Sequence, residues 1–209
     1  MIFYLMIEPP DNNQEQKFSE DISIKNVLEQ NRLNAVFYED SFAKTSFFTK
    51  IIPDWNIPIF YFDFDLLYSG FVKAETIPCP KNMTIITPDS TSLRDTLKSI
   101  IQKISETKSL VIIDSLNGFY NIFDEEKDVG RLINSIIMML TSSTKISKSL
   151  IIIACLSKLN DENNWVLYST GRHMIDNEHM TKIRLAKSNG IVTASILNTD
   201  NSKKIQVSF

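Results

Sequence analysis

The sequence has only two histidines and two cysteines, and this scarcity limits the chemistry that it can support. His173 and His179 lie in a polar stretch without a nearby cysteine. Cys79 and Cys155 are far apart, and Cys155 lies inside the apolar run SLIIIACL, which predicts a buried thiol in a reducing compartment. A metal site or a nucleophile triad therefore has almost nothing to build from.

The chain also lacks membrane-directing segments and an excess of positive charge. Its first ten residues, MIFYLMIEPP, are apolar for only seven residues and carry neither a basic region nor a small-residue cleavage site, so no signal peptide is predicted. No stretch approaches the ~18 apolar residues that span a bilayer. The net charge of −3 argues against a protein that coats nucleic acid. We expect a cytoplasmic protein with no membrane contact.

The composition that remains is typical of a globular chain. The 209 residues are 43% hydrophobic and 22% charged, which is enough to bury a sizeable core. No internal repeat or linker divides the sequence, so we expect residues 1–209 to form a single domain. Residues 1–20, which include PPDNNQEQ, are expected to be a loose N-terminal extension.

Five short, apolar and β-rich runs predict strands that are covered on both faces, as in a parallel sheet. They are NAVFY (34–38), IPIFYFDF (57–64), MTIIT (83–87), SLVIID (109–114) and SLIIIACL (149–156). Near the C-terminus, an Asn-Gly pair at 189–190 stands between two further β-rich runs and predicts an antiparallel hairpin. KIQVSF is expected to add one more strand.

Helix-like segments alternate with these strands. SFFTKII stops at Pro53, and the segment 90–106 has Asp89 and Ser90 placed to cap its first turn. That segment has an apolar stripe at helical spacing, formed by Leu93, Leu97, Ile100, Ile101 and Ile104. The segment 127–143 has a stripe formed by Leu132, Ile136 and Leu140. Strands that alternate with helices predict an α/β fold with a mainly parallel, twisted sheet flanked by helices.

The stretch YEDSFAKT, which begins at Tyr38, has the length and the ending of a phosphate-binding loop. Such a loop reads GxxxxGK[ST] and lies between a strand and a helix. Lys44 and Thr45 match its ending, where the lysine contacts phosphates and the hydroxyl binds Mg²⁺. Tyr38 and Ala43 replace the two glycines, and Asp40 adds negative charge near the phosphate positions. The alternative interpretation is a surface lysine beside a threonine that caps a helix.

Carboxylates stand at the ends of two predicted strands, where ligands of such sheets bind. Asp114 ends the run VIID, as the Mg²⁺-binding acid of P-loop enzymes ends its strand. A solvent-facing turn residue is an equal alternative. In FYFDFDLL, strand alternation places Asp63 and Asp65 on one face, where a carboxylate could orient an attacking water. The alternative is a polar strand end that faces solvent.

In their order, these segments resemble the ATPase core of the RecA/RadA recombinase superfamily. The resemblance runs from about Asn34 to the C-terminus and rests on YEDSFAKT, YFDFD, NMTIITPDSTSLRDTLKSIIQKI, LVIIDSLNGFY and TKIRLAKSNGIVTASILN. The sequence is most similar to the small archaeal RadB-like paralogues, and KaiC-like relatives share the same core. The resemblance implies a RecA-like P-loop NTPase core with a degenerate Walker A loop, and ATP with Mg²⁺ as ligands if that loop still binds them.

The resemblance also assigns roles to single residues. Lys44 and Thr45 correspond to the phosphate and Mg²⁺ residues, and Asp114 to the Walker B acid that completes the metal site. Asp65 falls where the family has a catalytic glutamate, and Glu39 matches an acidic residue common in the loop. The expected remnant of the nucleotide-binding loop also includes Ser41, Phe42 and Ala43.

Further departures from the family pattern weaken the expected activity. Cys155 and Leu156 stand where the family has the Asn-Gln pair that senses the γ-phosphate. The region of the DNA-binding loops reads LNDENNW, which is acidic rather than basic and glycine-rich. FVKA (71–74) has the letters of the recombinases' polymerisation motif but follows the second strand, so we treat it as chance.

Three functions remain open at this point. The first is a RecA-like paralogue without ATPase activity and without a bound cofactor, which acts as a protein-binding or regulatory subunit in DNA repair, recombination or signalling. The second is a weak Mg-ATP-dependent ATPase that uses Lys44, Thr45 and Asp114, with Asp65 activating water. The third is a single-strand DNA binder that uses lysines and aromatic residues such as Trp165 and Tyr168.

The first function also makes a prediction about the surface. We expect a protein partner, or self-association into a homo-oligomer, with weak or absent DNA binding. An exposed apolar patch should then exist. Its candidate residues are Phe42, Phe47, Tyr68 and Phe71, together with the region around Trp165 and Tyr168. The alternative is that most of these aromatic residues pack in the core, as large aromatic side chains usually do.

Overall fold

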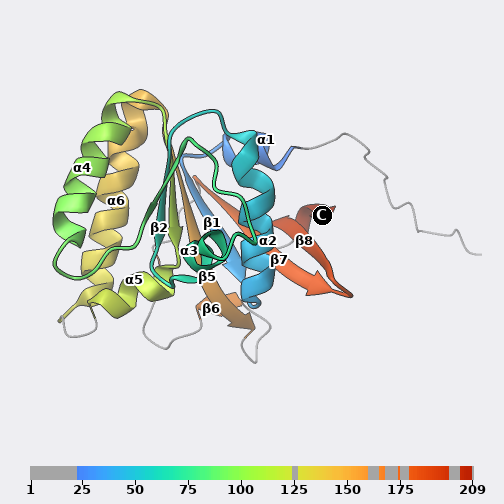
Figure 1. Cartoon of the computed structure of the whole chain (residues 1–209). Helices are drawn as coiled ribbons and strands as arrows, with labels where there is room; N and C mark the ends of the chain where they lie inside the picture. The colour runs from blue at the N-terminus through green and yellow to red at the C-terminus, as the bar shows by residue number, and fades with distance from the viewer. Residues whose placement is uncertain are drawn as a thin grey trace, which may run out of the picture.

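The sheet at the centre of the molecule contains all the strands that the sequence predicts. The computed structural model describes residues 23–123, 127–159, 165–167, 174, 179–197 and 203–208. The strands are β1 (Leu33–Tyr38), β2 (Ile59–Asp63), β3 (Met83–Ile86), β4 (Leu110–Asp114), β5 (Leu150–Leu159), β6 (Trp165–Leu167), β7 (Met180–Ser188), β8 (Ile191–Leu197) and β9 (Lys203–Ser208). Their order across the sheet is β3-β2-β4-β5-β1-β7-β8-β9, and β6 pairs with the end of β5 (Figure 1).

The pairing is parallel through the centre of the sheet and antiparallel at one edge. The pairs β3–β2, β2–β4, β4–β5, β5–β1 and β1–β7 are parallel. The pairs β7–β8 and β8–β9 are antiparallel. The turn between β7 and β8 contains Asn189 at φ 51° and Gly190 at φ 81°, both left-handed as tight hairpin turns require. The predicted parallel sheet with a C-terminal antiparallel hairpin is therefore confirmed.

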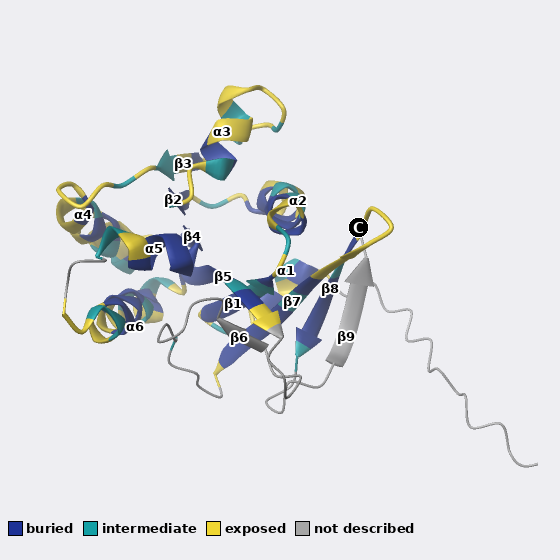
Figure 2. Ribbon diagram, turned by 90° about the horizontal axis from the view of Figure 1, so that it is seen from below, coloured by how far each residue is buried: buried dark blue, intermediate teal, exposed yellow. Residues whose placement is uncertain are grey.

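Helices cover both faces of the sheet (Figures 1 and 2). One face carries α1 (Ile24–Leu28), α2 (Ser41–Ile51), the short 3-10 helix η1 (Ile52–Asp54) and α3 (Leu67–Lys73). The other carries α4 (Leu93–Glu106), α5 (Leu116–Ile122) and α6 (Val129–Ser147). Side chains along each central strand alternate between the two cores, so that Ile112 packs on one face and Val111 and Ile113 on the other. This explains why the strands read as continuous apolar runs.

Two details of the local predictions need correction. Leu132 is 39% exposed, because α6 instead buries Ile133 with Ile136, Ile137 and Leu140 at i, i+3, i+4 and i+7. β2 ends at Asp63, so Asp65 lies in the turn beyond the strand and does not share a strand face with Asp63.

Several other predictions have a structural outcome. Asp89 accepts hydrogen bonds from the N–H groups of Thr91 and Ser92 and so orders the turn that precedes α4. The predicted capping by Asp89 and Ser90 is wrong, because α4 begins only at Leu93, with Ser92 at its N-cap and no side-chain hydrogen bond to its first turn. Cys155 is fully buried, as predicted, whereas Cys79 is exposed. Within the described residues, no helix is long and apolar enough to cross a bilayer. Several predictions fall outside the described residues: those on residues 1–20, residues 160–164, the Trp165 side chain, Tyr168 and His173.

Candidate nucleotide site

The structure brings Lys44 together with the carboxylates predicted to share its site. The Nζ atom of Lys44 lies 2.5 Å from Oδ1 of Asp114 and 3.3 Å from Oδ2 of Asp65. Lys44 comes from the first turn of α2, Asp114 ends β4, and Asp65 follows β2, so the cluster stands at the carboxyl edge of the sheet. Asp114 is only 1% exposed, which excludes the alternative of a solvent-facing turn residue.

The loop that precedes Lys44 is much shorter than a phosphate-binding loop. Helix α2 begins at Ser41, so only Glu39 and Asp40 separate it from β1. The Asp40 carboxylate accepts hydrogen bonds from the backbone N–H groups of Phe42 (2.7 Å) and Ala43 (3.1 Å). In a phosphate-binding loop, the backbone at the glycines bends around the phosphate. Here Ala43, at the second glycine position, is part of the helix instead. The N–H groups that would bind phosphate are therefore already satisfied by Asp40.

Lys44 is buried with its charge compensated by the surrounding side chains. It is 1% exposed, and its Nζ atom also lies 5.1 Å from the centroid of the Tyr38 ring, at the position of the first missing glycine. Burial, the largest single effect, would lower the pKa of Lys44, but the charge and hydrogen bond of Asp114, together with Tyr38 and Asp65, raise it above its ordinary value. The lysine is therefore held in its charged form by an internal partner.

Both carboxylate oxygens of Asp114 have hydrogen-bond partners. Tyr61 donates its hydroxyl proton to Oδ2 at 2.5 Å, while Lys44 occupies Oδ1. Burial raises the pKa of Asp114 to about 6, although the ammonium of Lys44 and the hydroxyl of Tyr61 favour the carboxylate. The Tyr61 ring stacks on Tyr68 with centroids 4.4 Å apart, which fixes the hydroxyl. Sequence reasoning missed Tyr61, because it reads as one more aromatic residue of a buried strand.

The second predicted Mg²⁺ residue is also engaged within the protein. Thr45 is 8% exposed, and its hydroxyl donates to the carbonyl oxygen of Ser41 at 2.9 Å, one turn earlier in α2. A nucleotide with Mg²⁺ would have to displace this bond, the Lys44–Asp114 pair and the Asp40 cap. The residues present therefore do not fit Mg-ATP in this arrangement.

Asp65 and Asp63 have different environments. Asp65 is exposed and lies beside Gly118 of α5, where an added Cβ would stand 2.5 Å from Oδ1 of Asp65. The same Cβ would stand 2.8 Å from Cβ of Phe64, which cannot move aside as the carboxylate can, so the close approach of α5 requires glycine there. Sequence reasoning also missed Gly118, which carries no sign of this contact in the stretch LNGFY. Asp63 is fully buried and accepts a hydrogen bond from the N–H of Ser69 at 2.6 Å. Asp63 therefore orders the start of α3. The alternative from the sequence, a polar strand end that faces solvent, is wrong for Asp63.

The remaining loop residues lie on the surface. Glu39 is exposed. Burial lowers the pKa of Arg184, and the negative charge of Glu39 opposes this effect by favouring the protonated guanidinium. Phe42 is 56% exposed and does not fill the nucleotide position. The centroid of its ring lies 4.2 Å from Nζ of Lys187. The same Nζ atom lies 3.7 Å from Oδ2 of Asp40. Within β5, the predicted sensor position holds buried Cys155 and half-buried Leu156, neither of which could report on a γ-phosphate.

An apolar groove adjoins this surface. It has a volume of about 570 Å³ and lies between α2, the end of α3 and the β7–β8 turn. Its lining includes Phe42 and Phe71, of which the second is 38% exposed. Phe47 and Tyr68 are buried, so their predicted part in an exposed patch is wrong. They face inward because each completes the core between its own helix and the sheet.

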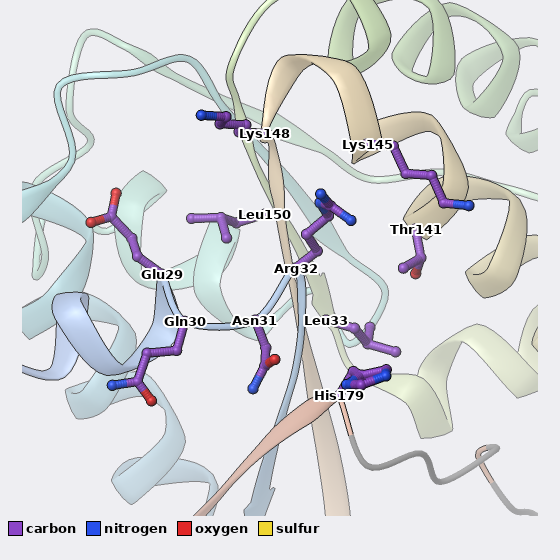
Figure 3. A pocket seen from close by; sticks show the side chains of 10 residues that line it. All are labelled: Glu29, Gln30, Asn31, Arg32, Leu33, Thr141, Lys145, Lys148, Leu150 and His179. Atoms are coloured by element: carbon purple, nitrogen blue, oxygen red, sulfur yellow. The ribbon is translucent and has the colours of Figure 1, made fainter.

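A second, basic pocket lies at the opposite edge of the sheet, where β1 and β5 begin. Its volume is about 670 Å³, and Arg32, Lys145, Lys148 and His179 contribute its basic side chains (Figure 3). Its described lining contains no tryptophan, tyrosine or phenylalanine. Because single-strand binders stack bases on aromatic rings, this pocket offers phosphate contacts but no stacking platform.

The sheet order, the helices on both faces and the Lys44–Thr45 pair at the start of the helix after β1 define a RecA-like core fold. A solved structure, titled "Crystal structure of the RadB recombinase", aligns with a TM-score of 0.55 at 13% sequence identity, over 86% of this chain and 87% of that one. The chain thus has a RadB-like core, as the sequence resemblance predicted, and at this identity the likeness concerns the fold. No protein-family model and no curated protein sequence matches the chain.

Proposed function

We propose that this chain is a RecA-like paralogue that does not hydrolyse ATP and acts through protein contacts in DNA repair or recombination. The observation that carries the proposal is the buried ion pair of Lys44 with Asp114, which stands where a competent core would hold Mg²⁺ and phosphate. The likeness to the RadB recombinase supports a role in DNA repair or recombination only through the shared fold.

The energetic argument is that nucleotide binding must first undo contacts that the folded chain already makes. Separating a buried ion pair costs about 3–5 kcal/mol when one charge is left without a partner. Displacing the Asp40 cap costs about 1 kcal/mol more. Together these costs weaken binding by a factor on the order of 10³–10⁴. The negative charge of Asp40 beside a phosphate adds to this penalty.

The test is calorimetric titration with ATP and ADP in the presence of Mg²⁺, together with thermal unfolding at saturating nucleotide. We expect no binding tighter than ~1 mM and no change of Tm, since only a ligand that binds the folded state raises it. Asp40→Asn removes the charge and keeps a capping oxygen, so it should bind nucleotide more tightly than the natural sequence.

A weak ATPase is the second candidate, and one observation favours it. Asp65 is exposed and lies 3.3 Å from Lys44, so a carboxylate is available beside the nucleotide position to orient a water. This candidate replaces the first if ATP binds more tightly than ~100 µM, turnover approaches ~1 per second, and Lys44→Met abolishes both.

The apolar groove is the surface that we assign to a protein partner. Its exposed phenylalanines offer a seat for an apolar segment, and Lys50 at its edge favours acidic flanking residues on that segment. A fluorescent apolar dye is the probe. Phe42→Ser and Phe71→Ser should each weaken dye binding, whereas Leu66→Ser, at another exposed leucine, should leave it unchanged. Equal binding by all variants would remove the groove from the proposal.

A further inference from the structure

The edge of the sheet at which β1 and β5 begin has a pocket that collects positive charge. Its volume is about 670 Å³, and three cations line it: Arg32, directly before β1, and Lys145 and Lys148, at the end of α6. Figure 3 shows that the Arg32 side chain extends toward the end of α6, where the two lysines lie. The whole chain has a net charge of −3, so composition alone does not explain three cations in one pocket.

These cations are not neutralised by neighbouring carboxylates. Within the described part of the chain, none of the three forms an ion pair. The one carboxylate of the pocket's described lining belongs to Glu29, and its Oε1 atom already lies 3.0 Å from Nζ of Lys108. Cations gathered without a counter-charge repel one another, so an anion that enters the pocket relieves this repulsion.

The backbone of Lys148 is left-handed, with φ 58° and ψ 31°. Helices that end in this way usually have glycine or asparagine there, because a β-carbon is disfavoured in the left-handed region. A lysine near the C-terminus of a helix also interacts favourably with the helix dipole, but Lys145 in the last turn of α6 already supplies that charge. The position therefore holds a less favourable residue than the helix end requires, as is common at binding sites.

The backbone that carries Arg32 is fixed by hydrogen bonds to two strands. The carbonyl oxygen of Arg32 accepts a hydrogen bond from the N–H of Ile151 in β5 at 2.8 Å. Next to it, Nδ2 of Asn31 donates to Oγ1 of Thr181 in β7 at 3.0 Å. A ligand therefore meets a guanidinium whose backbone is already ordered, which lowers the entropic cost of binding.

We propose that this pocket binds a small molecule that carries two or more phosphate groups. The guanidinium of Arg32 has parallel N–H donors that match two oxygens of one phosphate, and the lysines add point charges for a second. The volume falls within the ~300–1,000 Å³ of small-molecule sites and exceeds what a single phosphate occupies. Leu33 and Leu150, the first residues of β1 and β5, add an apolar wall for the organic part of such a ligand.

A compact ligand fits this pocket better than a nucleic acid does. The described lining contains no tryptophan, tyrosine or phenylalanine on which bases could stack. A strand of nucleic acid also needs basic residues along its path, whereas the sequence of α6 has no charged residue from Leu132 to Thr144. Along this helix, the positive charge is therefore confined to the end that lines the pocket.

Calorimetric titration of the full chain with inorganic pyrophosphate, in ~20 mM salt and without Mg²⁺, tests the proposal. Mg²⁺ is omitted because it would neutralise the phosphates. We expect a dissociation constant below ~1 mM, and at least ~10-fold lower than that of inorganic phosphate, which reaches fewer of the three cations. Pyrophosphate that binds more weakly than ~1 mM, or inorganic phosphate that binds as tightly as pyrophosphate, would overturn the proposal.

Single substitutions locate the bound pyrophosphate. Arg32→Gln and Lys145→Gln should each weaken binding by about 10-fold, the loss expected for one hydrogen bond to a charged group. Glu29→Gln should have the opposite effect, since it removes the carboxylate of the lining. The matched control is Lys98→Gln, at an exposed lysine of α4, which should bind as the natural sequence does. Binding by Arg32→Gln and Lys145→Gln as tight as that of the control would contradict the assignment.

Lys148→Gly separates ligand binding from a structural role of this residue. Glycine suits the left-handed backbone, so the variant should keep or raise the Tm while it weakens pyrophosphate binding by about 10-fold. Normal pyrophosphate binding by this variant would mean that the lysine only ends the helix, and it would count against the proposal.

A single-stranded oligonucleotide of ~20 nucleotides distinguishes the two sources of phosphate. Under the same conditions it should bind more weakly than pyrophosphate. Tighter binding of the oligonucleotide that is lost in Arg32→Gln would assign the pocket to nucleic acid and overturn the small-molecule ligand. The substituted residues of the pocket lie at the opposite edge of the sheet from Lys44, and no Mg-ATP is used, so the outcome is independent of the proposed function.

Discussion

The buried ion pair between Lys44 and Asp114 makes a quantitative prediction about stability. In Lys44→Met, the side chain keeps most of its volume but the ammonium is lost, so the Asp114 carboxylate is left buried without its charged partner. Such a group takes up a proton instead of remaining charged. Holding a carboxyl of ordinary pKa 3.8 protonated at pH 7 costs up to about 4 kcal/mol. The natural sequence already bears about 3 kcal/mol of this cost, because the pKa of its Asp114 is raised to about 6. We therefore expect Lys44→Met to lower the free energy of unfolding by a further ~1–2 kcal/mol at pH 7.

The pH dependence identifies the cause of this loss. In the variant, the folded chain keeps the Asp114 proton across the whole range from pH 7 to pH 5, whereas the natural sequence titrates the group near pH 6. The deficit of the variant should thus shrink by more than ~1 kcal/mol between pH 7 and pH 5. Urea unfolding followed by circular dichroism at the two pH values measures it.

Two further variants separate the charge effect from a packing effect. Lys50→Met removes an exposed lysine from the same helix and should change stability by less than ~0.5 kcal/mol. Lys44→Met combined with Asp114→Asn leaves no unpaired charge, so it should recover more than half of the loss and show no such pH dependence. A double variant as unstable as Lys44→Met, or a deficit equal at pH 7 and pH 5, would refute the reasoning.

Other perturbations have equally definite outcomes. Gly118→Ala should lower the free energy of unfolding by about 1–3 kcal/mol, because its Cβ would stand 2.8 Å from Cβ of Phe64. Gly70→Ala, with open space around it in α3, should be neutral or stabilising, and a thermal melt compares the two. Phe42→Ala should change the urea midpoint by the equivalent of less than ~0.5 kcal/mol, because the ring projects into solvent; a loss above ~2 kcal/mol would mean that it fills a cavity. Because the pKa of Asp114 is raised to about 6, binding of a proton to this group stabilises the folded chain. This stabilisation is fully present below pH ~4 and is lost as the pH rises through 6. Asp114→Asn should therefore remove this pH-dependent part of the free energy of unfolding, measured with urea between pH ~4 and pH ~7.

The sequence by itself determined the layers of this fold. Continuous apolar runs such as those of β4 and β5 require burial on both faces, and helical stripes between them supply the covering layers. These signals are local, because each depends on which side chains alternate along a few residues. The Asn189–Gly190 turn is equally local, since it needs only two residues that tolerate positive φ. The stripe of α6 shows the limit: Leu132 and Ile133 are both apolar neighbours, and only packing against α4 and the sheet selected Ile133.

The sequence also determined which charged residues meet, since Lys44 and Asp114 each follow or end a strand of one parallel sheet and so share its edge. Only the tertiary structure decided how they meet. The sequence could not show that α2 begins at Ser41 with Asp40 as its cap, or that the Tyr61 hydroxyl from a third strand completes the environment of Asp114. A buried charge is stable only when its partners, from several strands and helices, lie within hydrogen-bond distance together. That condition depends on distances between strands and helices across the sheet. The spacing of residues along the chain does not reveal these distances.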